Sequence, residues 1–77
     1  MPMTLDQAPR EVQVKIVGFS AVDGGERARL SGLGLRPGVL VTKLIPTPLQ
    51  DPVECLVGAQ LLALDRRLLR RILVESF

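Results

Sequence analysis

The fold is decided by the stretch Arg36-Pro37-Gly38-Val39-Leu40-Val41-Thr42-Lys43-Leu44-Ile45-Pro46. Pro37 presets the backbone at the first central position of a tight turn, and Gly38 accepts the positive φ that a type II turn needs next. Residues 39–45 are rich in β-branched side chains and predict a buried strand. Pro46 ends that strand, because proline has no N–H to give to a neighbouring strand.

Further strands are predicted on both sides of this stretch. Upstream, apolar and polar residues alternate from Val12 to Ile16, which is typical of a half-buried strand. Downstream we expect strands at 53–57, 60–64 and 70–75, with Gly58-Ala59 as a hairpin connection and Asp65 capping one brief helical turn.

One helix is predicted between Asp23 and Gly34. Asp23 can accept a hydrogen bond at the start of the helix, and Glu26 can reach back to close a capping box. Leu30 and Leu33 share a face at helical spacing. Gly34 provides a left-handed stop.

These elements predict a mainly β fold, a small SH3-like barrel of about five strands with one short α-helix. A barrel is favoured because an open sheet of this size would leave two edges exposed. Residues 1–10 contain two prolines and are interpreted as a flexible N-terminal arm, which leaves residues 11–77 as the domain.

The composition argues against an enzyme. The chain has 77 residues, enough for one small domain, and no His, so the usual general base near neutral pH is absent. No nucleophile–base pair is evident. The N-terminus lacks a signal-peptide pattern and no apolar run is long enough to span a bilayer, so we expect a cytoplasmic protein, recruited to the inner face of the membrane only through a partner.

A tight metal site or a cofactor is not expected. Transition metals favour converging imidazole, thiolate and carboxylate ligands. Cys55 is the only cysteine, and its alternation with Val53 and Val57 places it on an inward strand face. The carboxylates are scattered along the chain. Any metal ion is expected to bind weakly and to be shared between chains through carboxylates.

Two sets of residues are candidates for contact with a protein partner. The proline-rich stretch 46–52 is either a rigid connection or a preorganised binding loop, and its candidate contacts are Pro48, Leu49, Asp51 and Pro52. The flanking strands carry more apolar residues than a small barrel needs to bury. An exposed patch is therefore expected at Leu40, Leu44 and Leu56, serving either a weak homodimer or a partner protein.

Basic residues form a further candidate, the run that contains Arg66, Arg67, Arg70 and Arg71. This run is either a solvated face or a positive patch for an acidic protein surface or anionic lipid. Nucleic acid is disfavoured because no aromatic residue is interleaved for base stacking. Arg29 borders the buried face of the helix, and we interpret it as a structural clamp whose stem packs on the barrel.

The chain resembles the FeoA family of small cytoplasmic proteins associated with bacterial ferrous-iron uptake. The resemblance covers nearly all of the chain after residue 10. Its matching segments are Ile16-Val17-Gly18-Phe19, Arg29-Leu30, Leu33-Gly34-Leu35-Arg36-Pro37-Gly38, Pro48-Leu49-Gln50-Asp51-Pro52, Leu62-Ala63-Leu64 and Ile72-Leu73-Val74. Arg29, Leu30, Gly34, Pro37 and Gly38 belong to its structural motif, and Gln50 departs from it, because the family usually has glycine there.

The resemblance implies a non-enzymatic adaptor or regulator that contacts the cytoplasmic part of the FeoB-type ferrous iron transporter. Two alternatives stay open. One is a transition-metal-binding protein that handles the ion directly, against which the absence of His argues. The other is an SH3-like module related to those of iron-dependent transcriptional regulators, against which the absence of a DNA-binding helix pair argues.

Overall fold

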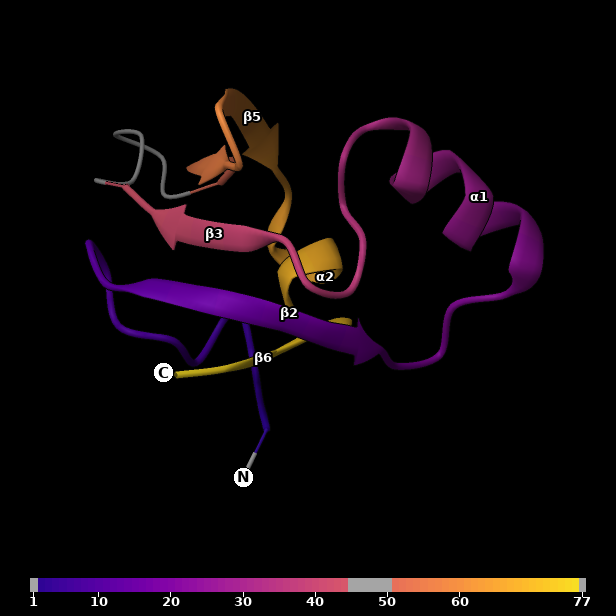
Figure 1. The fold of residues 1–77 in the computed structure, drawn as a ribbon, viewed down its shortest axis with the longest axis horizontal. Coiled ribbons are helices and arrows are strands. Elements are labelled where there is room, and N and C mark those ends of the chain that lie inside the picture. Colours follow the sequence, from indigo (N-terminus) through magenta and orange to yellow (C-terminus); the bar gives the residue numbers. More distant parts are fainter. Residues whose placement is uncertain (1, 45–50, 77) are drawn as a thin grey trace.

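The computed structural model describes residues 2–44 and 51–76, which form one antiparallel sheet and two helices (Figure 1). The elements, in chain order, are β1 (Met3–Thr4), β2 (Gln13–Phe19), α1 (Gly24–Gly32), β3 (Leu40–Lys43), β4 (Val53–Val57), β5 (Gln60–Leu64), α2 (Arg66–Leu69) and β6 (Ile72–Glu75). The mainly β prediction is confirmed. The sixth strand, β1, comes from the segment that we expected to be an arm.

The strands are ordered β1-β6-β2-β3-β4-β5, and every neighbouring pair is antiparallel. The long strand β2 pairs with both β3 and β6, and its register with β6 shifts between Ile16 and Gly18. Such a bulge bends a strand and increases its twist. Strands β1 and β5 stand at the two ends of this order, so β5 has a sheet neighbour on one side only.

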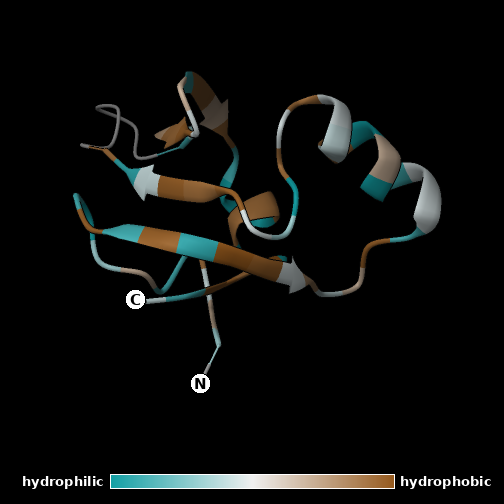
Figure 2. Cartoon of the chain, in the orientation of Figure 1, coloured by the Kyte–Doolittle hydropathy of each residue, from teal (hydrophilic) through white to brown (hydrophobic). Residues whose placement is uncertain are grey.

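The core forms because alternate residues of the strands point to the same side of the sheet. Along β2, Val14 and Ile16 are buried while Gln13 and Lys15 are exposed, and Figure 2 shows the hydrophobic and hydrophilic bands that result. Buried residues of the other elements close over them; they include Leu30, Leu35, Val41, Val53, Cys55, Val57, Leu64, Leu69, Ile72 and Val74.

The N-terminal segment belongs to the domain, so the prediction of an arm is wrong. Leu5 is completely buried and Ala8 almost so. The backbone N–H of Leu5 donates to the oxygen of Ile72 at 2.8 Å. The prolines at positions 2 and 9 flank this packed stretch without interrupting it, since both are exposed.

Helix α1 begins at its predicted cap, Asp23, and ends before Gly34 as predicted, while the Glu26 carboxylate lies near Arg29 and Arg71. The Asp23 carboxylate accepts a hydrogen bond of 2.8 Å from the N–H of Glu26, and Gly34 adopts a φ of 94° after the helix. Leu30 is buried, but Leu33 is 45% exposed, so the expected shared face is wrong. The helix ends at Gly32, and the left-handed turn that follows sends Leu35 into the core in place of Leu33.

The turn before β3 also follows the prediction. Gly38 has a φ of 93°, and the N–H of Val39 donates to the oxygen of Arg36 at 3.1 Å. The positive φ is the reason that glycine is needed there. Among residues 2–44 and 51–76, no helix has the length and apolar character required to cross a membrane.

Candidate protein-binding surface

The outer side of β4 and β5 carries two exposed leucines that face each other. Buried Val53, Cys55 and Val57 alternate with exposed residues, so Leu56 points away from the core and is 36% exposed. Its partner across the hairpin is Leu61, which is 65% exposed. Cross-strand partners lie about 5 Å apart, so the two side chains form one apolar surface. We call Leu40, Leu44, Leu56 and Leu61 the outer leucine face.

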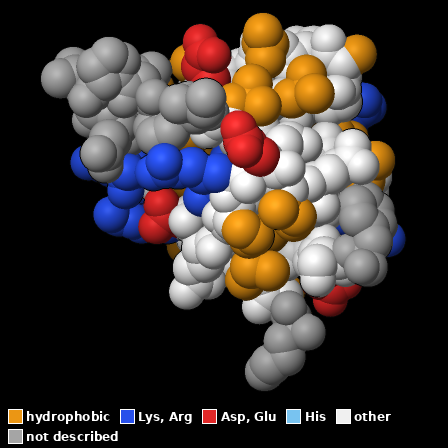
Figure 3. Space-filling model, turned by 90° about the vertical axis from the view of Figure 1, so that its left-hand side faces the viewer, with side chains coloured by type: hydrophobic (Ala, Val, Ile, Leu, Met, Phe, Trp, Pro, Cys, Tyr) orange, Lys and Arg blue, Asp and Glu red, His pale blue; other side chains and the backbone are white. Residues whose placement is uncertain are grey.

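The two remaining members of the outer leucine face come from β3 and from the residue just after it. Leu40 and Leu44 are half-buried, while Val41 and Lys43 between them point inward. Thr42 lies opposite Leu56, between Leu40 and Leu44 in the chain. In Figure 3, hydrophobic side chains gather near the top of the molecule, at the height of β5 in Figure 1. Of the patch expected at Leu40, Leu44 and Leu56, Leu56 is the exposed member.

Leu61 was not among the residues predicted to form the exposed patch, although the sequence contains a signal that indicates it. Once Gly58-Ala59 is taken as a two-residue connection, Val57 pairs with Gln60 and Leu56 must pair with Leu61. Alternation then places both leucines on the same side of the sheet. Leu61 is the most exposed large hydrophobic residue in the described part of the chain.

The candidate loop is only partly described. Pro48 and Leu49 lie outside the described residues, while Asp51 and Pro52 are exposed. The Asp51 carboxylate accepts a hydrogen bond of 3.1 Å from the N–H of Arg66, at the beginning of α2. Asp51 therefore ties the end of the loop to that helix.

The four arginines around α2 do not form a single patch. Arg66 lines a cavity of about 170 Å³ together with Arg10 and Lys43. Arg67 and Arg71 line a different cavity of about 130 Å³ between the two helices, where Arg71 lies 3.6 Å from Glu26. Residues four apart in a helix lie on the same side of it. Arg66 and Arg70 therefore lie on one side of α2, and Arg67 and Arg71 on another.

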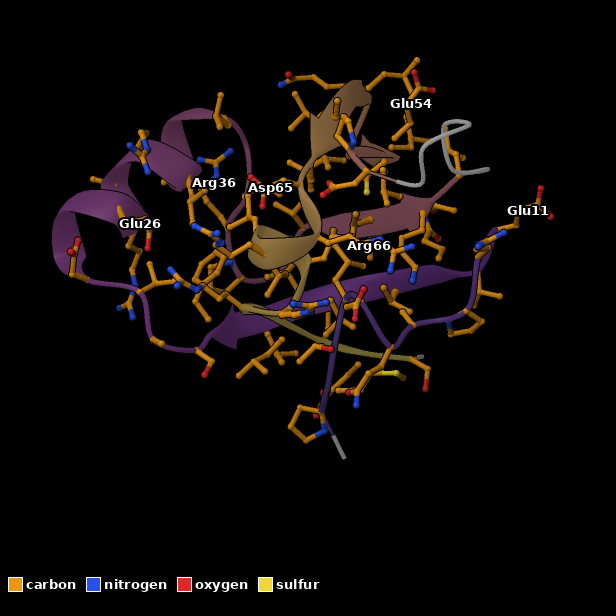
Figure 4. The ribbon with its side chains drawn as sticks, turned by 180° about the vertical axis from the view of Figure 1, so that it is seen from behind. Glu11, Glu26, Arg36, Glu54, Asp65 and Arg66 are labelled. Atoms are coloured by element: carbon orange, nitrogen blue, oxygen red, sulfur yellow. The ribbon has the colours of Figure 1, made fainter. Side chains whose placement is uncertain are left out.

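Figure 4 shows where the charged groups lie: Glu26 on α1, Asp65 and Arg66 at α2, and Glu54 on the outside of the sheet. Arg70 lies 3.8 Å from the Asp6 carboxylate. Arg29, interpreted from the sequence as a structural clamp, is 72% exposed and lies 3.5 Å from Glu26 one turn earlier. All three ion pairs among the described residues are at least partly exposed, and such pairs contribute little to stability.

Burial shifts the pKa of two side chains on the core side of the sheet, Cys55 and Lys43. Cys55 is buried, and its removal from water raises the pKa of the thiol to about 11, an effect that Lys43 partly opposes. Burial lowers the pKa of Lys43, which lies opposite Cys55, and the Asp6 carboxylate partly offsets this. Both shifts disfavour the charged form. Across residues 2–44 and 51–76, no three His, Cys, Asp or Glu side chains lie together as metal ligands.

Comparison with known proteins shows which family this chain and its fold belong to. The model of the FeoA domain matches residues 3–76. A comparison with curated proteins finds no match. Among solved structures, iron(II) transport protein A from Clostridium thermocellum is 30% identical with a TM-score of 0.84, over 96% of this chain and 45% of that one. The present chain thus spans about half the length of that relative.

Two further structures are similar over nearly the whole chain. The FeoA protein from Chlorobium tepidum is 28% identical with a TM-score of 0.85, over 97% of this chain and 70% of that one. Stenotrophomonas maltophilia FeoA complexed with zinc, described as a procaryotic SH3 domain protein, is 24% identical with a TM-score of 0.77, over 95% and 89% of the two chains. The SH3-like prediction is confirmed, and the chain belongs to the FeoA family.

Proposed function

We propose that this protein is a non-enzymatic accessory factor of ferrous iron transport that binds the cytoplasmic part of a FeoB-type transporter. The observation that carries the proposal is the outer leucine face. There Leu56 and Leu61 lie opposite each other and are 36% and 65% exposed. Exposed apolar side chains that gather on one surface usually mark an interaction site.

Family membership supports the link to iron transport. The FeoA domain extends over residues 3–76, and the Stenotrophomonas maltophilia relative is proposed to be a ferrous iron transport activating factor. A binding role also suits the chemistry of the chain, which has no His in its 77 residues. Its one thiol is buried, and a thiol with a pKa near 11 is a poor nucleophile at neutral pH.

The binding surface extends from the outer leucine face toward the end of the loop at Asp51 and Pro52. Both residues are exposed, and the loop leads directly into β4, which carries Leu56. We place the protein in the cytoplasm, where it would meet the transporter at the membrane. The arginines on the two sides of α2 would then assist docking near anionic lipid, at about 1 kcal/mol per basic residue close to the surface.

The proposal is tested by measuring the affinity of the protein for the purified cytoplasmic domain of its transporter. Leu61→Ser is expected to weaken binding by about tenfold or more, because central apolar contacts dominate the energy of protein interfaces. Val12→Ser is the matched control, since Val12 is also exposed, at 43%, but precedes β2 and lies off the outer leucine face. Equal losses in both variants, or none in either, would contradict the proposal.

A further inference from the structure

The hydrogen-bond pattern of the sheet shows which backbone groups of β5 face outward. Between β3 and β4, the N–H of Gly58 donates to the oxygen of Leu40 and the N–H of Leu44 donates to the oxygen of Glu54, both at 2.9 Å. The backbone groups of residues 54 and 58 therefore face β3. In an antiparallel ladder successive residues turn to opposite sides, so Val53, Cys55 and Val57 direct theirs toward β5.

The same alternation continues into β5. Val53, Cys55 and Val57 are paired with Leu64, Leu62 and Gln60 respectively. These three residues of β5 therefore exchange hydrogen bonds with β4. Leu61 and Ala63 turn their N–H and C=O groups the other way, toward the open edge of the sheet. In the described part of the chain, no backbone hydrogen bond from another segment reaches these two residues.

This edge lacks the features by which proteins usually protect an exposed strand. Natural edge strands carry charges, prolines or bulges, or are very short. The strand Gln60-Leu61-Leu62-Ala63-Leu64 has no charge and no proline, and its register with β4 is regular over all five residues. The opposite edge is formed by β1, which has two residues. Beside the open groups of β5, Leu61 is 65% exposed.

We propose that the free edge of β5 is a strand-addition site, at which an extended segment of the transporter's cytoplasmic part joins the sheet next to β5. Its backbone pairs with the N–H and C=O groups of Leu61 and Ala63. Its alternate side chains are apolar on the side that meets Leu61. This inference rests on the proposed function and names the way in which the partner binds.

The size of the edge favours a peptide segment over a second copy of this chain. Five residues span roughly 17 Å of strand. A stable interface between two folded proteins buries about 1,200–2,000 Å². One short strand with two open residues falls well below that, whereas an extended peptide obtains its affinity from main-chain hydrogen bonds and one or two side-chain contacts.

The discriminating variant is Ala63→Pro. Proline lacks an N–H, and the N–H of Ala63 points to the open edge, so the substitution removes an outward donor and no ladder hydrogen bond. The Ala63 side chain is exposed, so no core contact is lost. Affinity for the transporter's cytoplasmic domain is expected to fall by about tenfold or more. Val12→Thr is the control: it replaces an exposed residue outside β5, so it should bind like wild type.

Amide hydrogen exchange provides the second readout. In the free protein the amides of Leu61 and Ala63 should exchange rapidly, while those of Leu62 and Leu64 are protected by β4. Adding the transporter domain should slow exchange at Leu61 and Ala63. Continued protection at Leu62 and Leu64 in Ala63→Pro shows that the variant is folded.

Each other outcome overturns the inference in a distinct way. If the domain binds wild type and Ala63→Pro equally, without protecting Leu61 and Ala63, strand addition is wrong and the proposed function stands. If the domain does not bind wild type at all, both are wrong. If the two amides become protected on concentrating the protein alone, the edge is occupied by a second copy.

Discussion

The Nζ of Lys43 donates a hydrogen bond of 2.9 Å to the backbone oxygen of Asp6, 37 residues earlier in the chain. Lys43 is the one buried charged residue in the described chain, with an exposed fraction of 9%. On the other side of the same segment, the N–H of Asp6 donates to the oxygen of Leu69 at 3.3 Å. The N-terminal segment is thus held by β3 and by α2 together.

Replacing Lys43 by Met should therefore destabilise the protein. The aliphatic part of the side chain is kept, but the partly buried oxygen of Asp6 loses its donor, which should cost about 1 kcal/mol. Denaturant unfolding of wild type and K43M measures the difference. Lys15→Met is the control, because Lys15 is exposed on β2 and its replacement should change stability by less than about 0.5 kcal/mol. Equal stability of K43M and wild type would show that this bond contributes nothing.

Leu5 tests whether the N-terminal segment is part of the core. Its side chain is completely buried, so Leu5→Ala should lower the free energy of unfolding by about 2–5 kcal/mol. Pro2→Ala, at an exposed position in the same segment, should have little effect. Thermal unfolding followed by circular dichroism measures both. A dispensable arm would instead give two variants as stable as wild type.

The sequence predicted the strands of the sheet better than it predicted the N-terminal segment. The alternation of apolar and polar residues, together with the turn residues Gly58 and Ala59, predicted the observed bounds of β4 and β5. A two-residue connection between two strands allows only one pairing register. The segment 3–8 was missed, because its burial depends on contacts with β6 and with Lys43, which are distant in sequence. Local pattern carries no information about such contacts.

In the candidate site, too, local sequence pattern predicted which strand residues are exposed but not which charged residues lie together. Leu56 was identified because alternation on β4 turns it outward, and Leu61 was recoverable from the hairpin register. For the basic run around α2, the sequence left two interpretations open, a solvated face or one positive patch, because its residues are adjacent in sequence. A helical turn distributes them to two sides, where Arg70 and Arg71 lie near different acidic residues. Composition alone could not show this division.

Cys55 should make stability depend on pH in the alkaline range. The folded protein holds the thiol proton up to a pKa of about 11, whereas the unfolded chain releases it near the ordinary value of 9.0. The folded state thus binds more protons in this window, so stability falls as the pH rises from 9 to 11. At about 1.4 kcal/mol per pH unit the loss approaches 2–3 kcal/mol.

The difference between wild type and Cys55→Ala isolates this effect, because the alanine variant retains Lys43, whose lowered pKa acts in the opposite direction. Urea unfolding at pH 8, 9, 10 and 11 should show the two proteins converging as the pH increases, by the amount given above. Parallel curves would mean that the thiol is equally free to ionise in both states.

Asp65 should stabilise the short helix α2 by capping its N-terminus. Its carboxylate accepts a hydrogen bond of 2.8 Å from the N–H of Leu68. Asp65→Ala removes this cap and should destabilise the protein by about 1 kcal/mol, while Asp65→Asn keeps an acceptor and should cost much less. Chemical denaturation distinguishes the two. If both variants lose the same stability, the negative charge and not the hydrogen bond is what matters.

The most direct test of the proposed function is a backbone-amide NMR titration of the ¹⁵N-labelled protein, first with the cytoplasmic domain of its transporter and then with ferrous ion alone. We expect shifts that cluster on the outer leucine face, β5 and the chain around Asp51 with the domain. With the ion alone we expect small, scattered changes near exposed carboxylates. Strong changes confined to one place with the ion, and none with the domain, would contradict the account and identify a protein that handles the metal itself.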